Sequence, residues 1–167
     1  MTKVELLSAL KGFTEHAVRG LMLPVRYQEC DDVPPKPRAA KVYSMRLTKS
    51  GASQKAAPYI IHQLITGKDS QVGGARCSGT ANVRSIFCVY NEDEQQGGLL
   101  LLGLMERLRV NLLKRIVIAG QFQLCLKGDG LEALIYPDDT APYYIGEMMS
   151  VWHLPAVERE VGFNHGY

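Results

Sequence analysis

A long stretch with helical periodicity, residues 95–116, is the feature that most constrains the fold. Five apolar side chains recur there at intervals of three and four: Leu101, Met105, Leu108, Leu112 and Ile116. This spacing places them on one face of an α-helix. Acidic residues precede the stretch and Lys114 and Arg115 end it, so both ends suit the helix dipole. An apolar face of this length must be buried, which predicts a second layer packed against the helix.

Strand patterns lie on both sides of this helix. Residues 59–65 and 82–90 are rich in β-branched and aromatic residues, and the second run is apolar on both faces near its end. That pattern predicts a central strand covered on both sides. Residues 143–154 form a long final strand that ends before Pro155, and residues 41–47 are expected to form an edge strand.

Two further patterns complete the expected order of elements. Residues 122–126 and 131–136 flank the glycine-rich run 127–130, which predicts a β-hairpin. Thr2 and Glu5 have the spacing of a capping box, and Leu7 and Leu10 continue a helical pattern with Val4 as far as Gly20. The expected class is α+β, with a mixed or antiparallel β-sheet packed against two main α-helices.

The length of 167 residues suits one domain, which we place at residues 1–157. Three prolines between positions 34 and 37 predict a stiff arm or linker within residues 21–57. The glycines at 67–82 predict a long flexible loop, and residues 158–167 are expected to be a mobile tail.

The sequence lacks the motifs of common catalytic and cofactor sites. There is no phosphate-binding glycine loop, no nucleophile elbow and no zinc-protease motif, so no cofactor is expected. The four cysteines form no C-x-x-C pair, and Cys77, in the glycine-rich segment, is the best candidate for a reactive thiol. His62 and His153 fall in strand patterns, where a hydrogen-bonded structural histidine is favoured over a ligand. The N-terminus shows no signal peptide and no run is long enough to span a membrane, so a soluble cytosolic chain is expected.

Four segments of the second half resemble the tail terminator, or tail-completion, proteins of tailed bacteriophages. They are residues 58–61, 83–93, 96–109 and 143–155. The family pattern is a "PYIIV" strand, an "R-x-I-x-G-x-Y-x-E-D" strand, an "I-x-R-I-R" helix and a closing "Y-x-x-G-E-M-x-x-x-W-x-L-P" strand. The order and spacing of the segments carry the resemblance, which covers about residues 41–157. Cys88 stands where the pattern has glycine, and segments 34–55 and 67–82 have no counterpart in it.

The resemblance implies a non-enzymatic virion protein that closes into a ring, usually a hexamer, at the head-proximal end of the tail tube. Such a ring stops tube polymerisation and joins the tail to the head-side neck protein. The implied partners are further copies of the chain, the tail tube protein, the neck or stopper protein and possibly the tail sheath. Genomic DNA passes through the lumen without specific binding. The protein would lie in the neck of the virion, and in the host cytoplasm during assembly.

Charge is divided along the chain and suggests candidate surfaces. Residues 33–84 carry nine Lys/Arg and one acid, whereas residues 85–167 carry six Lys/Arg and eleven acids. Unlike patches suit head-to-tail ring contacts. The candidate ring or tube contacts are Lys36, Arg38, Lys41, Arg46, Lys49, Lys55 and Arg76. A lumen that lets DNA slide should not be cationic, so the candidate lining is Glu92, Asp93, Glu94, Asp138 and Asp139.

Other readings of the same features stay open. The acidic run 92–94 could bind a divalent cation, although a solvated turn is favoured because the spacing of a calcium loop is missing. The chain could be another neck component, such as a head–tail stopper or connector-completion protein. A small cytosolic enzyme that uses Cys77 or a histidine is the alternative from a different class.

Overall fold

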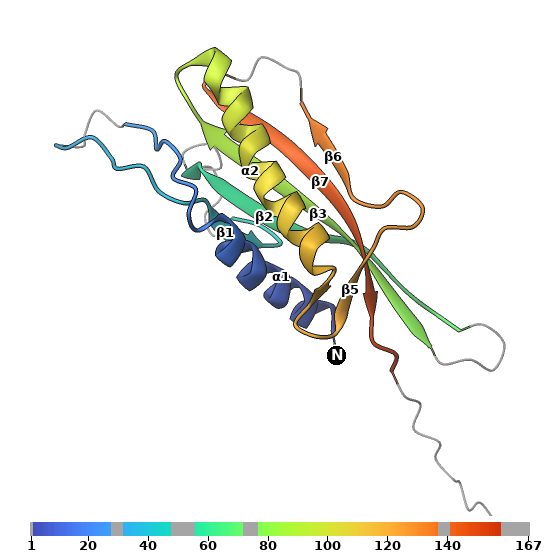
Figure 1. Cartoon of the computed structure of the whole chain (residues 1–167). Helices are drawn as coiled ribbons and strands as arrows, with labels where there is room; N and C mark the ends of the chain where they lie inside the picture. The colour runs from blue at the N-terminus through green and yellow to red at the C-terminus, as the bar shows by residue number, and fades with distance from the viewer. Residues whose placement is uncertain (1, 28–31, 48–55, 72–76, 137–140, 158–167) are drawn as a thin grey trace, which may run out of the picture.

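The computed structural model describes residues 2–27, 32–47, 56–71, 77–136 and 141–157. Two helices lie on one face of a seven-stranded sheet, which confirms the α+β class (Figure 1). The elements are α1 (Lys3–Val18), β1 (Lys41–Ser44), β2 (Tyr59–Ser70), β3 (Ser78–Tyr90), α2 (Glu94–Arg115), β4 (Val117–Ile118), β5 (Phe122–Cys125), β6 (Glu132–Ile135) and β7 (Tyr143–Leu154). No helix within these residues is long and apolar enough to cross a membrane.

The strand order is β1-β2-β3-β7-β5-β4, and β6 also pairs with β7. β1 is parallel to β2, whereas every other pair is antiparallel. β3 lies between β2 and β7 and buries its last four residues, as the sequence pattern predicts for a central strand. α1 covers β1 and β2, and α2 covers β3 and β7.

α1 begins as the sequence predicts, with Thr2 and Glu5 forming its capping box. α2 begins one residue before the predicted start, at Glu94, and Asp93 caps it by accepting from the amides of Gln95 and Gln96. Along α2 the apolar stripe is buried from Leu101 to Leu112. Ile116 does not continue the helix, because its φ of 55° takes the chain out of the helical region.

The face of the sheet beneath the helices holds the main core, which includes Phe87, Met105 and Trp152. A smaller cluster around Tyr59, Cys88 and Tyr143 lies on the opposite face. Val4 was expected on the buried stripe of α1, but it is 75% exposed. Leu6 is buried in its place, together with Leu7, Leu10 and Val18, because the helix presents the flanking position to the sheet.

The predicted flexible loop at 67–82 is wrong over most of its length. Residues 67–70 continue β2 and residues 78–82 belong to β3, with Gly67 opposite Ala81 and Asp69 opposite Gly79. Gly67 and Gly79 are tolerated because each lies in a paired ladder, where the partner strand fixes the extended backbone, and residues 72–76 lie outside the described residues.

The predicted hairpin of residues 122–136 is also wrong. β5 and β6 do not pair with each other; both pair with the same edge of β7 and run in the same direction. Cys125 lies opposite Val151 and Glu132 opposite Met149, so residues 126–131 bulge out from one interrupted strand. Gly128 and Gly130 do adopt positive φ, so the turn chemistry is present although the chain does not reverse.

The arm proposed at residues 21–57 contains β1 and a short antiparallel bridge. Leu23 and Arg38 exchange both backbone hydrogen bonds, which ties the two described pieces of the arm together. Leu23 is fully buried in the main core. Residues 158–167, which are expected to form a mobile tail, lie outside the described residues.

Candidate functional site

The sheet ends in β1 on one side, whereas on the opposite side of the molecule β6 and the short β4 are both outermost strands (Figure 1). We define the β1 edge as residues 41–44 and the β6 edge as residues 132–136. Within the described residues, β1 has a strand partner only on its β2 side and β6 only on its β7 side. Unpaired strand edges are templates for pairing with another chain.

The β6 edge exposes apolar side chains on both faces of the sheet. Leu134 is 53% exposed, and Ile135 and Tyr136 are each 40% exposed. Ile135 lies opposite Gly146 on the helix side, whereas Leu134 lies opposite Glu147 on the other side. Natural edge strands usually carry charges or prolines that prevent association, so an apolar edge of this kind indicates a contact surface.

The sequence gives no direct signal for the β6 edge. Leu134, Ile135 and Tyr136 look like an ordinary buried strand, and the hairpin reading placed them against β5. In a hairpin, β5 would have covered the outer edge of β6. Because β5 pairs with β7 instead, the outer edge of β6 is left exposed.

The two edges differ in charge. Lys41 is exposed on β1, and Arg46 is exposed just after that strand. At the β6 edge, Glu132 is exposed, and Glu147 on β7 lies directly opposite Leu134 in the ladder. A hydrogen bond to the Glu147 carboxylate raises the pKa of Tyr136 and places an acceptor beside the edge.

Glu147 is partly compensated within its own subunit. Arg84 on β3 approaches it at 3.7 Å between Nη1 and Oε1. The same guanidinium donates to the Gln63 side chain at 2.7 and 3.1 Å, so Arg84 is shared between neighbours on this face. Glu147 is therefore positioned at the sheet surface without a tight, fully neutralising ion pair.

Among the candidate contact residues, Arg38 has an internal role. Its guanidinium donates to the backbone carbonyls of Ala39, Pro58 and Ala56 at 2.9–3.0 Å, and burial lowers its pKa. Lys36 is exposed, as are the cations near β1 described above. Lys49, Lys55 and Arg76 lie outside the described residues.

The acidic run is the turn between β3 and α2. Asp93 is the helix cap, and Glu92 accepts a hydrogen bond from the Tyr90 hydroxyl at 2.8 Å. Glu94 begins α2, where a carboxylate stabilises the positive end of the helix dipole. All three side chains are exposed. Asp138 and Asp139 lie outside the described residues.

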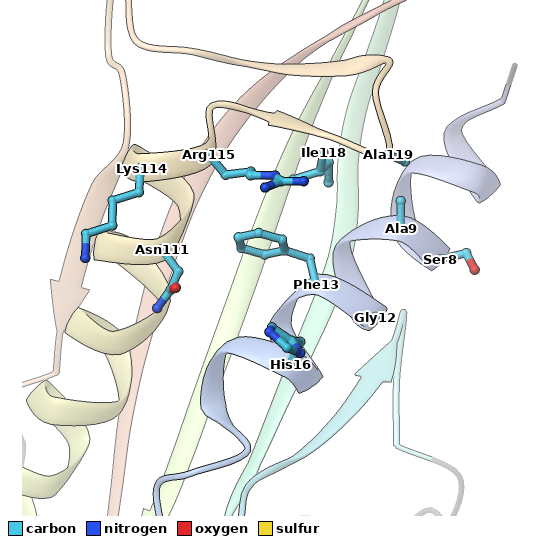
Figure 2. A pocket seen from close by; sticks show the side chains of 10 residues that line it. All are labelled: Ser8, Ala9, Gly12, Phe13, His16, Asn111, Lys114, Arg115, Ile118 and Ala119. Carbon is cyan, nitrogen blue, oxygen red and sulfur yellow. The ribbon is translucent and has the colours of Figure 1, made fainter.

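A groove of about 650 Å³ separates α1 from the end of α2 (Figure 2). Its lining is Ser8, Ala9, Gly12, Phe13, His16, Asn111, Lys114, Arg115, Ile118 and Ala119. Phe13 and Ile118 give it an apolar floor, while cationic groups come from α2. Ser8 and His16 both line it, but they are eight residues apart on α1, about 12 Å along the helix axis, which is too far for the imidazole to activate the hydroxyl.

His62 is fully buried between α1 and the sheet. Its ring nitrogens hydrogen bond the hydroxyls of Thr14 at 2.9 Å and Ser85 at 2.8 Å. A neutral imidazole has one N–H donor and one acceptor, and a hydroxyl can take either role, so the arrangement is satisfied without charge. Burial lowers the pKa of His62 to about 3. The expected structural histidine is confirmed at this position.

The three described cysteines lie in different parts of the fold. Cys77 is half-buried, and its sulfur lies 3.8 Å from the Gln71 side chain. Cys88 is buried beside Tyr59, and burial raises the pKa of its thiol to about 11, which keeps it protonated at neutral pH. Within the part of the chain that the structure describes, no three His, Cys, Asp or Glu side chains gather as metal ligands.

No protein-family model matches this chain, and no curated protein matches it.

Proposed function

We propose that this chain is a bacteriophage tail terminator. In this role it assembles into a ring, with six copies as the expected number, on the head-proximal end of the tail tube. The ring stops tube polymerisation and joins the tail to the head-side neck proteins. The observation that carries the proposal is the presence of two unlike open edges, β1 and β6, on opposite sides of one sheet.

Unlike edges are what a ring of identical subunits requires. A ring uses heterologous contacts, in which one patch of a subunit meets a different patch of the next. A self-complementary patch would instead give a closed dimer. Here a basic edge near Lys41 and an apolar edge with acidic neighbours near Glu132 are separated by the width of the sheet.

The distal part of the β2–β3 hairpin supplies a surface for the tail tube protein. Residues 65–70 of β2 are exposed, and this end of the hairpin extends past the helices (Figure 1). An ion pair of 2.9 Å between Lys3 and Asp69 connects it to the start of α1. In the proposed ring, the exposed carboxylates of Glu92 and Glu94 face the lumen and repel DNA phosphates, so that the genome slides through.

The test is deletion of the gene from the genome that encodes it, followed by electron microscopy of the lysate. Without a terminator, nothing stops tube growth, so tails of excessive and variable length are expected, detached from heads. Wild-type protein supplied in trans should restore uniform tails. Tails of normal length that merely fail to join heads would overturn termination and indicate a stopper.

A pair of variants links this phenotype to the β6 edge. Leu134→Asp places a charge on the apolar edge and should fail to restore uniform tails. Leu99→Asp is the matched control, since Leu99 is 61% exposed and lies on helix α2, outside both strand edges. Equal rescue by both variants would contradict the use of this edge in assembly.

A further inference from the structure

We infer that neighbouring copies of this chain join by antiparallel pairing of the β1 edge of one copy with the β6 edge of the next, with Tyr43 opposite Leu134. The ring closure itself rests on the proposed function. The inference concerns the joint between two copies, and it predicts the partner, the strand direction and the register.

Strand direction follows from the topology. β1 runs parallel to β2, β2 antiparallel to β3, β3 antiparallel to β7, and β7 antiparallel to β6. β1 and β6 therefore run in opposite directions within one subunit. When a second copy continues the sheet in the same orientation, its β1 meets the first copy's β6 as an antiparallel pair, the more stable of the two ladder types.

The pleat restricts the register. Lys41 and Tyr43 lie opposite Tyr59 and Ile61, on the sheet face away from the helices. Leu134 lies on that same face, opposite Glu147, whereas Ile135 lies on the helix side. Directly opposed residues in an antiparallel ladder share a face. Tyr43 can therefore lie opposite Leu134 but never opposite Ile135.

This register places apolar side chains opposite each other and brings a lysine close to a carboxylate. With Tyr43 opposite Leu134, Val42 lies opposite Ile135 and Lys41 lies opposite Tyr136. Lys41 then approaches Glu147, which the Tyr136 side chain contacts. Met45 falls opposite Glu132 at the other end of the joint, and Arg46 follows one residue later. Opposite charges and apolar pairs across strands each stabilise a ladder by roughly 0.2–1 kcal/mol.

The second copy is favoured as occupant because the two edges fit each other. Both strands have four residues, and their charges are opposite in sign. Pairing would also cover the apolar side chains of the β6 edge, which a monomer leaves 40–53% exposed. A different protein that paired with one of these edges would leave the other edge uncovered.

Cysteine cross-linking tests the joint in the full-length chain. The background replaces every native cysteine except the buried Cys88 by serine: Cys30→Ser, Cys77→Ser and Cys125→Ser. Tyr43→Cys with Leu134→Cys should then convert the monomer band into a covalent ladder on non-reducing gels after mild oxidation. Disulfide formation traps transient neighbours, so a weak association is also captured. A double variant that stays monomeric at high protein concentration would overturn the joint.

Matched variants separate this joint from other contacts. Tyr43→Cys with Ile135→Cys should give no ladder, because the two sulfurs would lie on opposite faces of the sheet. Ile65→Cys with Leu134→Cys tests pairing of β6 with the open distal edge of β2, and a ladder there would contradict the β1 assignment. Either single variant can only form dimers, and a strong dimer from Leu134→Cys alone would indicate β6–β6 pairing instead.

A second cysteine pair guards against a folding defect, since Tyr43 packs partly against the smaller core cluster. Lys41→Cys with Tyr136→Cys uses exposed positions and should give the same ladder. The outcomes also separate this inference from the proposed function. If the cysteine pair gives a covalent ladder but deletion of the gene leaves tail length unchanged, the joint stands and the terminator function is rejected. If the protein restores uniform tails but the cysteine pairs give no ladder, the terminator function stands and the joint is rejected.

Discussion

The buried imidazole of His62 makes the stability of this protein depend on pH. In the folded state its pKa is lowered to about 3 by burial, whereas an unfolded histidine titrates at about 6.5. Between these values the unfolded chain binds a proton that the folded chain does not. The contribution of neutral His62 to the unfolding free energy is therefore fully present above about pH 6.5 and is lost progressively as the pH falls toward 3.

The expected size follows from the same linkage. Each pH unit below 6.5 costs about 1.4 kcal/mol as long as His62 stays neutral in the folded state. At about pH 5 the unfolding free energy should thus be about 2 kcal/mol lower than at about pH 7.5. The ordinary pKa values of aspartate and glutamate lie below this window, so carboxylates contribute little to the slope.

Urea unfolding followed by the fluorescence of Trp152 measures this directly, since it is the single tryptophan and is fully buried. His62→Gln keeps a polar neutral side chain and should remove most of the slope, whatever its effect on absolute stability. His153→Gln, at an exposed position on β7, should keep the wild-type slope. If His62→Gln loses as much stability as wild type between the two pH values, the account of His62 is refuted.

Two further predictions concern helix α2. Gly97→Ala should lower the unfolding free energy by about 1–3 kcal/mol in urea titration, because a Cβ there would overlap the Tyr144 ring. Gly98→Ala, with nothing within 4 Å of its Cβ, should instead raise it by about 0.5–1 kcal/mol, and equal effects would refute the packing argument. Asp93→Ala should cost about 1 kcal/mol of stability through loss of the helix cap, whereas Glu92→Gln should change it by less than about 0.5 kcal/mol. Both substitutions remove one negative charge, so equal decreases in stability would show that the lost charge, rather than the lost helix cap, causes the effect.

Elements with a strong local signal are predictable from the sequence. α2 was expected at 95–116 and spans Glu94–Arg115, because its stripe, its acidic start and its basic end all agree. The last strand was expected at 143–154 and has those bounds. The Thr2–Glu5 capping box was equally readable, since its hydrogen bonds join residues three apart.

Pairing over long distances is where prediction from the sequence failed. The run 127–130 has the residues of a turn, but turn residues do not determine which strand β5 and β6 pair with. Both strands pair with the longer β7. Gly67 and Gly79 indicated a loop because the strands that hold them extended could not be seen locally. The β6 edge was missed for the same reason, because exposure of Leu134 depends on neighbours distant in sequence. The acidic run was readable as a turn, yet the cap at Asp93 is visible only in the structure.

The β2–β3 hairpin combines two environments in one pair of strands. Near Tyr59, β2 lies between β1 and β3, but beyond His62 its outer side has no strand partner among the described residues. β3 is paired on both sides along nearly its whole length, from Gly79 to Cys88. Amide hydrogen exchange should therefore rise along β2 toward Ser70 while β3 beside it stays protected. One strand of the hairpin therefore lies inside the sheet, whereas the distal half of the other is an edge strand, the kind of strand that can accept a further strand from a partner.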